Sequence, residues 1–104
     1  MISYHVFFTP KPEVSDAEAL AAVHGFLGGL EKEKHLRHYR VMRVTNPASF
    51  HGLPRFQAIV DYATQEELDA AMAFMRQPGK KEAGPHGQLM HILADFRVSF
   101  TADA

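Results

Sequence analysis

The chain has 104 residues, of which 46% are hydrophobic and 22% charged, and it contains neither Cys nor Trp. This length predicts one domain over residues 1–104, since domains typically hold about 100–150 residues. Eleven basic and twelve acidic side chains, interleaved along the chain, give a formal charge of −1. The composition therefore argues against a nucleic-acid partner and against disulfides, thiolate nucleophiles and Cys-type zinc sites.

No apolar run approaches the ~18 residues that a membrane-spanning helix needs. The first residues, Met-Ile-Ser-Tyr-His, lack the basic-then-apolar order of a signal peptide. We therefore expect a cytoplasmic protein with no membrane partner.

Residues 1–10 alternate with the two-residue period of a β-strand. One face is apolar or aromatic: Ile2, Tyr4, Val6 and Phe8. The other face is mixed: Ser3, His5, Phe7 and Thr9. Pro10 and Pro12 are expected to end the strand, because neither can donate a ladder hydrogen bond.

Two helices are predicted, each beginning with a capping box in which Ser or Thr precedes Glu by three residues. The boxes are Ser15 with Glu18 and Thr64 with Glu67. Apolar residues follow at helical spacing: Leu20, Val23, Leu27 and Leu30 in the first helix, and Leu68, Ala71, Met72 and Met75 in the second. Three glycines in the first helix (Gly25, Gly28 and Gly29) are expected to allow close approach to a sheet. The competing interpretation is that the helix ends near Gly28.

Three more strands are predicted at 36–45, 55–62 and 90–100, with a polar loop over 80–88 before the last. The element order β-α-β-β-α-β predicts a ferredoxin-like α+β fold, a four-stranded antiparallel sheet with two helices on one face. The first and third strands are expected at the centre of this sheet. Charged residues on the second and fourth strands suit edge positions.

Two helices can cover only one face of such a sheet. The predicted covered face holds the apolar rows, including Phe56, Ala58, Val60 and Tyr62 from the third strand and Ala94, Phe96, Val98 and Phe100 from the fourth. The other face then holds polar and apolar side chains together: Ser3, His5, Phe7, Thr9, Arg55, Gln57, Ile59, Asp61, Leu93, Asp95, Arg97 and Ser99. This mixture indicates a surface that is covered yet able to form hydrogen bonds.

The opening His5-Val6-Phe7-Phe8, together with the element order, resembles the dimeric α/β-barrel proteins, which include the stress-responsive A/B-barrel (Dabb) proteins and the antibiotic-biosynthesis-type monooxygenases. The resemblance implies a homodimer whose sheets enclose a cavity on the mixed face. For an enzyme it implies a cofactor-independent oxygenase, isomerase or decarboxylase. Haem-degrading members of this group use a Trp and a His in the second helix, and neither is present here.

The candidate site is on the mixed face. His5 is the candidate acid, base or hydrogen-bond anchor, and the alternative is a histidine satisfied by Gln57 or Asp61. Arg97 could anchor a ligand carboxylate or could simply pair with a neighbouring Asp. The candidate ligand-binding residues are Phe7, Gln57, Ile59, Asp61, Asp95, Arg97 and Tyr39. Periodicity leaves open whether Tyr39, Val41 and Arg43 face this site or His38, Arg40 and Met42.

No metal site is expected, because His35 and His38 would point to opposite faces of a strand and no H-E-x-x-H is present. Residues 79–87 could form a lid or a plain connector. The 46–54 loop, with Phe50 and Leu53, is a candidate contact with a partner subunit.

The sequence thus supports two hypotheses and leaves open whether the protein is an enzyme. In the first, a homodimer binds or converts a small organic molecule on the mixed face with His5 as the central group. In the second, a structural or regulatory dimer uses the mixed face only as its core.

Overall fold

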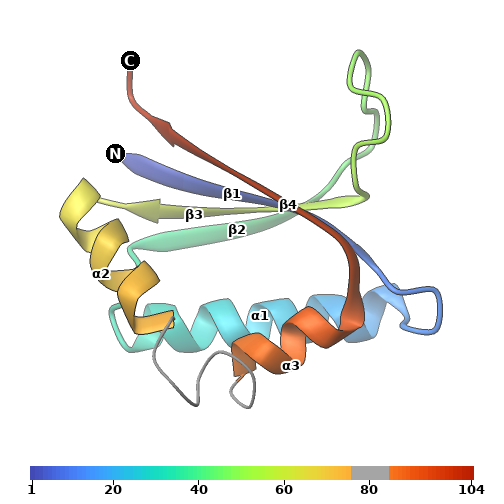
Figure 1. Ribbon diagram of the computed structural model, residues 1–104, viewed down its shortest axis with the longest axis horizontal. Coiled ribbons are helices and arrows are strands. Elements are labelled where there is room, and N and C mark those ends of the chain that lie inside the picture. The colour runs from blue at the N-terminus through green and yellow to red at the C-terminus, as the bar shows by residue number, and fades with distance from the viewer. Residues whose placement is uncertain (76–84) are drawn as a thin grey trace.

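Four strands pair into one antiparallel sheet in the order β2-β3-β1-β4 (Figure 1). The computed structural model describes residues 1–75 and 85–104. Its elements are β1 (Ile2–Pro10), α1 (Asp16–Lys32), β2 (His38–Arg43), β3 (Phe56–Tyr62), α2 (Gln65–Met75), α3 (Pro85–Ile92) and β4 (Leu93–Ala102). The central β1 and β3 and the edge strands β2 and β4 confirm the expected ferredoxin-like arrangement.

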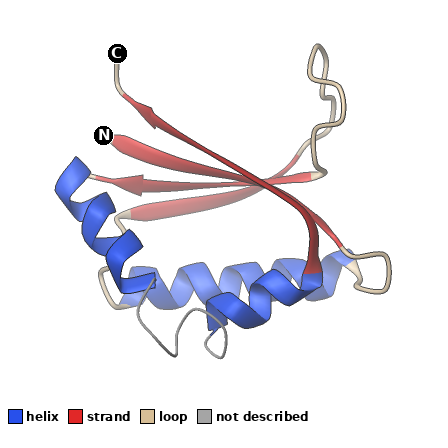
Figure 2. Ribbon diagram, in the orientation of Figure 1, coloured by secondary structure: helices blue, strands red, loops and turns tan. Residues whose placement is uncertain are grey.

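The helices lie on one side of the sheet, and no helix of the described residues covers the other side (Figure 2). We call these sides the helix-covered face and the open face. The loop between β2 and β3 rises on the open side, away from the helices (Figure 1). Within the described ranges, no helix is both long enough and apolar enough to cross a membrane.

The core lies between the sheet and the helices. Phe8, Phe56 and Val60 are its most deeply buried large side chains, and the rings of Phe8 and Phe56 stack with centroids 5.5 Å apart. Val23 and Leu27 of α1 bury their side chains against this cluster. The predicted apolar rows of β1 and β3 therefore face the helices, because alternate residues of a strand point to opposite sides.

Side-chain caps hold the starts of α1 and α2. The Glu18 amide donates to Ser15 Oγ at 3.1 Å, and the Glu67 amide donates to Thr64 Oγ1 at 3.2 Å. The carboxylate of Glu67 accepts from the Ala63 amide at 3.0 Å rather than from Thr64. The serine and threonine halves of both predicted capping boxes are thus confirmed.

Helix α1 runs through all three of its glycines, so the interpretation that it ends near Gly28 is wrong. A Cβ on Gly28 would lie 3.4 Å from the Tyr39 hydroxyl, which makes this glycine the point of close approach to the sheet. A Cβ on Gly25 or Gly29 would meet nothing within 4 Å. Close approach of α1 to the sheet therefore accounts for the glycine at position 28 but not for those at positions 25 and 29.

A third helix, α3, replaces part of the loop expected over 80–88. Pro85 opens it, at a position where the missing N–H would have no helical partner. Leu89, Ile92 and Leu93 follow at spacings of three and four and pack into the core. The helix packs against α1. The part of the candidate lid at 79–84 lies outside the described residues.

The start of β4 differs from the prediction because of a β-bulge. The pairing of β1 with β4 shifts between Thr9 and Pro10, so that Pro10 lies opposite Leu93 while Thr9 lies opposite Asp95. Leu93 consequently turns into the core and is 7% exposed, while Ala94 is exposed. The predictions that placed Leu93 on the open face and Ala94 in the covered row are wrong.

Replacing Gly29 with Ala should raise the free energy of unfolding by about 0.5–1 kcal/mol, because Ala loses less backbone entropy in a helix and the added methyl meets open space. The matched control is Gly52→Ala, which should destabilise because Gly52 has a φ of +70°. Urea unfolding measures both, and a loss of stability in Gly29→Ala would contradict this account of α1.

Candidate functional site

The open face carries nearly all of the predicted site residues. The strand register places His5 opposite Ile59 and Ser99, and Phe7 opposite Gln57 and Arg97. Asp61 and Asp95 lie on the same face, opposite Ser3 and Thr9. The predicted row is therefore assembled, with most of its side chains half-buried.

His5 is held by hydrogen bonds on both ring nitrogens. Gln57 Nε2 lies 3.2 Å from His5 Nδ1, and His5 Nε2 lies 2.8 Å from Thr101 Oγ1. With the amide donating to Nδ1, the ring carries its proton on Nε2 and donates to Thr101. This bridge ties β3, β1 and β4 together and leaves neither nitrogen free for a ligand, unless one contact is given up.

Three other charged residues of the open face, Asp61, Asp95 and Arg97, also form hydrogen bonds. The Arg97 guanidinium donates to both Asp95 carboxylate oxygens, at 3.1 and 2.9 Å, and to the Gly52 carbonyl at 2.8 Å. The last contact fastens the β2–β3 loop to β4. Ser3 Oγ donates to Asp61 at 2.6 Å.

Tyr39 lies on the helix-covered face, so its expected place beside His5 is wrong. Its hydroxyl lies 3.2 Å from His24 Nδ1 and against Gly28 of α1. Because β2 pairs with β3 in a register that sets Tyr39 opposite Val60, the open face of β2 instead carries His38, Arg40 and Met42. This settles the alternative that periodicity had left open.

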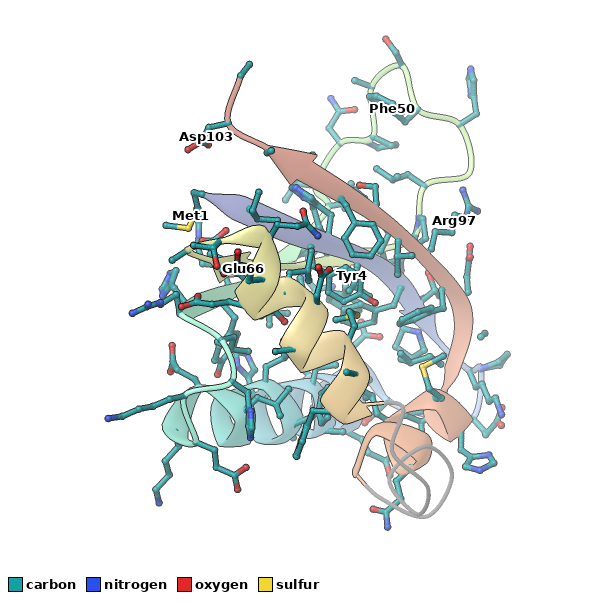
Figure 3. All side chains as sticks on the ribbon, turned by 60° about the vertical axis from the view of Figure 1, so that its left-hand side comes forward. Met1, Tyr4, Phe50, Glu66, Arg97 and Asp103 are labelled. Carbon is teal, nitrogen blue, oxygen red and sulfur yellow. The ribbon has the colours of Figure 1, made fainter. Side chains whose placement is uncertain are left out.

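A cavity of about 280 Å3, partly open to the surface, lies between the sheet and the helices. Its walls are mostly apolar side chains from β1, β3, α1, α2 and α3, and none of the described residues that line it belongs to the open face. The lining includes three side chains with polar atoms: Tyr4, Tyr62 and His35. Figure 3 shows Tyr4 at the centre of the molecule, between the sheet and the helices.

The two tyrosines bring phenol hydroxyls into this apolar space. Tyr62 is 3% exposed and Tyr4 half-buried, and within the described part of the chain neither hydroxyl has a hydrogen-bond partner. Burial and the nearby Tyr4 raise the pKa of Tyr62 from 10.0 to about 12, and burial raises the pKa of Tyr4. Both groups are therefore neutral phenols near pH 7, able to donate a hydrogen bond.

His35 occupies the rim of the cavity, in the connection between α1 and β2. Its ring stacks on Phe74 with centroids 4.2 Å apart, and Nε2 lies 3.4 Å from a Glu33 carboxylate oxygen. Phe74 and His35 also line a wider groove of about 940 Å3 at the surface between α1 and α2. His35 thus lies where the cavity and this outer groove meet.

Neither tyrosine nor His35 was identified from the sequence as a site residue. Tyr4 and Tyr62 lie in rows whose apolar alternation is typical of a hydrophobic core. Their phenol hydroxyls were the one feature of the sequence that could have indicated a binding site there. The spacing of His35 from His38 concerns only metal binding and carries no signal for a place at a cavity. Across the described ranges, His, Asp and Glu side chains do not gather in groups of three or more that could hold a metal ion.

The raised pKa values predict that stability falls as pH rises from about 10 to about 12. In this window the unfolded chain loses the Tyr62 proton while the folded chain retains it, so the contribution present below pH 10 is progressively lost. Urea unfolding across this window should show a shallower decline for Tyr62→Phe than for the wild type. An unchanged decline would show that Tyr62 is not the buried phenol responsible.

Three solved structures with this fold illustrate its range. SnoaB, a cofactor-independent oxygenase from Streptomyces nogalater, matches with a TM-score of 0.72 and 13% identity, covering 98% of this chain and 91% of that one. A hydroxynitrile lyase from Passiflora edulis matches with a TM-score of 0.71 and 12% identity, covering 96% and 90%. A dimeric ferredoxin-like protein of unknown function from Jannaschia sp. CCS1 matches with a TM-score of 0.71 and 17% identity, covering 99% and 100%.

At these identities the likeness concerns the fold, and at that level it confirms the expected resemblance to dimeric α/β-barrel proteins. No curated protein matches the chain in sequence. A family model matches residues 1–101, nearly the whole chain. The chain therefore belongs to the family of unknown function DUF6614.

Proposed function

We propose that the protein binds a small, largely apolar organic molecule carrying an acceptor oxygen in the cavity between the sheet and the helices. The observation that carries this proposal is the pair of tyrosine hydroxyls, Tyr4 and Tyr62, which lie at the cavity without partners among the described residues. A buried donor without a partner costs about 1–3 kcal/mol. A carbonyl or phenolate oxygen in the cavity would remove that cost.

The size and lining of the cavity define the class of ligand. About 280 Å3 lies near the lower end of ligand pockets. A cavity of roughly 150 Å3 already holds benzene, so one or two rings with a small substituent would fit. Aliphatic and aromatic side chains such as Val6, Leu27 and Phe96 form most of the wall and favour an apolar ligand body.

Conversion of the ligand is chemically reasonable at such a site. Two neutral hydroxyls donating to one oxygen would stabilise negative charge that develops there, as in an enolate. The fold is compatible with this chemistry, because solved structures that share it include an oxygenase and a lyase. The reaction itself has to come from the site and not from the fold.

We propose a second copy of the chain as the partner of the open face. Phe7, Met42 and Ile59 lie there half-buried among polar groups that are already hydrogen-bonded, which suits a covered interface. The similar Jannaschia protein is a dimer. In this arrangement the His5 bridge would belong to the dimer core, while the ligand would lie on the other side of the sheet.

The β2–β3 loop would extend this interface. Phe50, which is 69% exposed, stands at the loop on the open side of the sheet (Figure 3). The Ala48 amide donates to Asn46 Oδ1 at 2.9 Å and the Phe50 amide donates to the Pro47 carbonyl at 2.9 Å, so hydrogen bonds hold the turn that presents Phe50. An aromatic side chain held in this way is suited to a pocket on a partner.

Ligand binding can be tested with acetophenone and ethylbenzene, which have similar shapes but differ in the carbonyl oxygen. Calorimetric titration should show acetophenone binding about five- to thirtyfold more tightly, as expected for one or two hydrogen bonds of about 1 kcal/mol each. The double variant Tyr4→Phe with Tyr62→Phe should abolish this preference.

The matched control for that titration is Tyr39→Phe, which removes a phenol from the same sheet face but outside the cavity. It should leave the preference unchanged. Acetophenone binding that survives the double variant and is lost in His5→Ala would instead place the ligand on the open face.

The dimer can be tested by sedimentation equilibrium. The wild type should sediment as a dimer, and Ile59→Lys should give a monomer, because Ile59 lies on the open face between His5 and Arg40. Phe50→Ser should weaken the dimer about tenfold. Ala21→Lys, at an exposed position of α1, is the control and should remain dimeric. A monomeric wild type would refute the proposal.

A further inference from the structure

We propose that His35 accepts and returns a proton of the ligand in the cavity, and that it exchanges this proton with solvent through the groove between α1 and α2. The inference rests on the proposed binding of an oxygen-bearing ligand beside Tyr4 and Tyr62. It adds the class of reaction, which is proton transfer at an acidic O–H or at a C–H next to a carbonyl.

Position is the first argument. Among the described residues that line the cavity, His35 is the histidine, the residue type whose side chain ordinarily gains and loses a proton near neutral pH. His35, Ala71 and Phe74 line both the cavity and the outer groove. An imidazole at this place contacts the apolar interior on one side and water on the other.

Orientation of the ring is the second argument. The ring lies flat on Phe74, and its Nε2 faces the Glu33 carboxylate at 3.4 Å. Nδ1 has no hydrogen-bond partner among the described residues. A carboxylate that orients one nitrogen while the other stays available is a common arrangement for an acid–base histidine.

The backbone before His35 is also held in an unusual conformation. Lys34 has a φ of 64°, a region that non-glycine residues seldom occupy. The turn is fixed by the His35 amide, which donates to the Leu30 carbonyl at 2.8 Å, and by the Lys34 amide, which donates to Glu31 at 3.0 Å. This end of α1 therefore places His35 at the rim at some cost in backbone strain.

The proposed step is balanced without any other reactant. The ligand O–H or C–H bond breaks, a bond forms between that hydrogen and the free imidazole nitrogen, and the electron pair stays on the ligand. The resulting oxyanion accepts hydrogen bonds from Tyr4 and Tyr62. The imidazolium then returns the proton to the ligand, at the same or another atom, or releases it to water in the groove.

The charges around His35 come from three elements. They are Glu31 of α1, Glu33, Lys34 and Arg37 of the connection, and Glu67 of α2, while the sheet contributes the neutral phenols Tyr4 and Tyr62. Arg37 and Glu67 neutralise each other in an ion pair of 2.7 Å. Glu31, Glu33 and Lys34 are the other charged side chains near the ring.

The test uses 4-nitrophenol, whose phenol and phenolate forms absorb at different wavelengths. With the full-length protein in excess, the bound dye should contain about tenfold more phenolate relative to phenol than free dye at the same pH. His35→Gln should still bind the dye within about threefold of the wild-type affinity, but this excess should disappear. His51→Gln, which removes an exposed loop histidine, should behave as the wild type.

The outcomes separate the two proposals. If the wild type does not bind the dye, the proposed function fails and this inference fails with it. If the dye binds and His35→Gln shows the same phenolate excess, the cavity function stands and the role of His35 is refuted. Should His35→Gln fold poorly, Glu33→Gln gives a second readout, with an expected loss of about two- to threefold in the excess; an unchanged excess would refute the role.

Discussion

Every residue of β1 from Ile2 to Phe8 is paired on both sides, with β3 and with β4, and this double register determines the chemistry of both faces. Tyr4 lies opposite Val60 and Phe100, and His5 lies opposite Ile59 and Ser99. Side chains alternate along a strand, so a slip by one residue would exchange the two faces. The register therefore decides that a phenol enters the cavity while an imidazole joins the open face.

The two faces of the sheet differ in whether their polar side chains have hydrogen-bond partners within the chain. On the open face, His5, Gln57, Asp61 and Arg97 all have hydrogen-bond partners within the chain. On the helix-covered face, two phenols adjoin an apolar space with no such partner in the described part of the chain. Groups already satisfied by the fold contribute to a stable surface, whereas unsatisfied ones have more to gain from a ligand.

Much of the fold follows from local patterns. The alternation in β1 and β3 and the Ser15 and Thr64 caps depend on near neighbours, and a sequence displays these directly. The orientation of β2 cannot be predicted in this way, because both of its alternating rows mix apolar with basic residues. Only the pairing with β3 decides which row faces the helices. The sequence pattern does not reveal helix α3, because Pro85 is typical of a loop and also suits the first turn of a helix.

The site was harder to predict than the fold for a physical reason. Reading strands by polarity assigns Tyr4 and Tyr62 to the core, and they do lie there. The polarity of the sequence does not show how far the helices lie from the sheet. In the structure this separation leaves a cavity beside the two hydroxyls. His35 depends on still less local information, since its position at the rim follows from the end of α1 and from the placement of α2.

The absence of Trp has a practical consequence for this fold. Intrinsic fluorescence must come from the three tyrosines, and two of them line the cavity. Tyr4 also stacks on Phe100 with ring centroids 5.1 Å apart, and Phe100 is 54% exposed at the edge strand. Any molecule that enters would change the surroundings of most of the emitting rings, so the protein carries its own label-free reporter of occupancy.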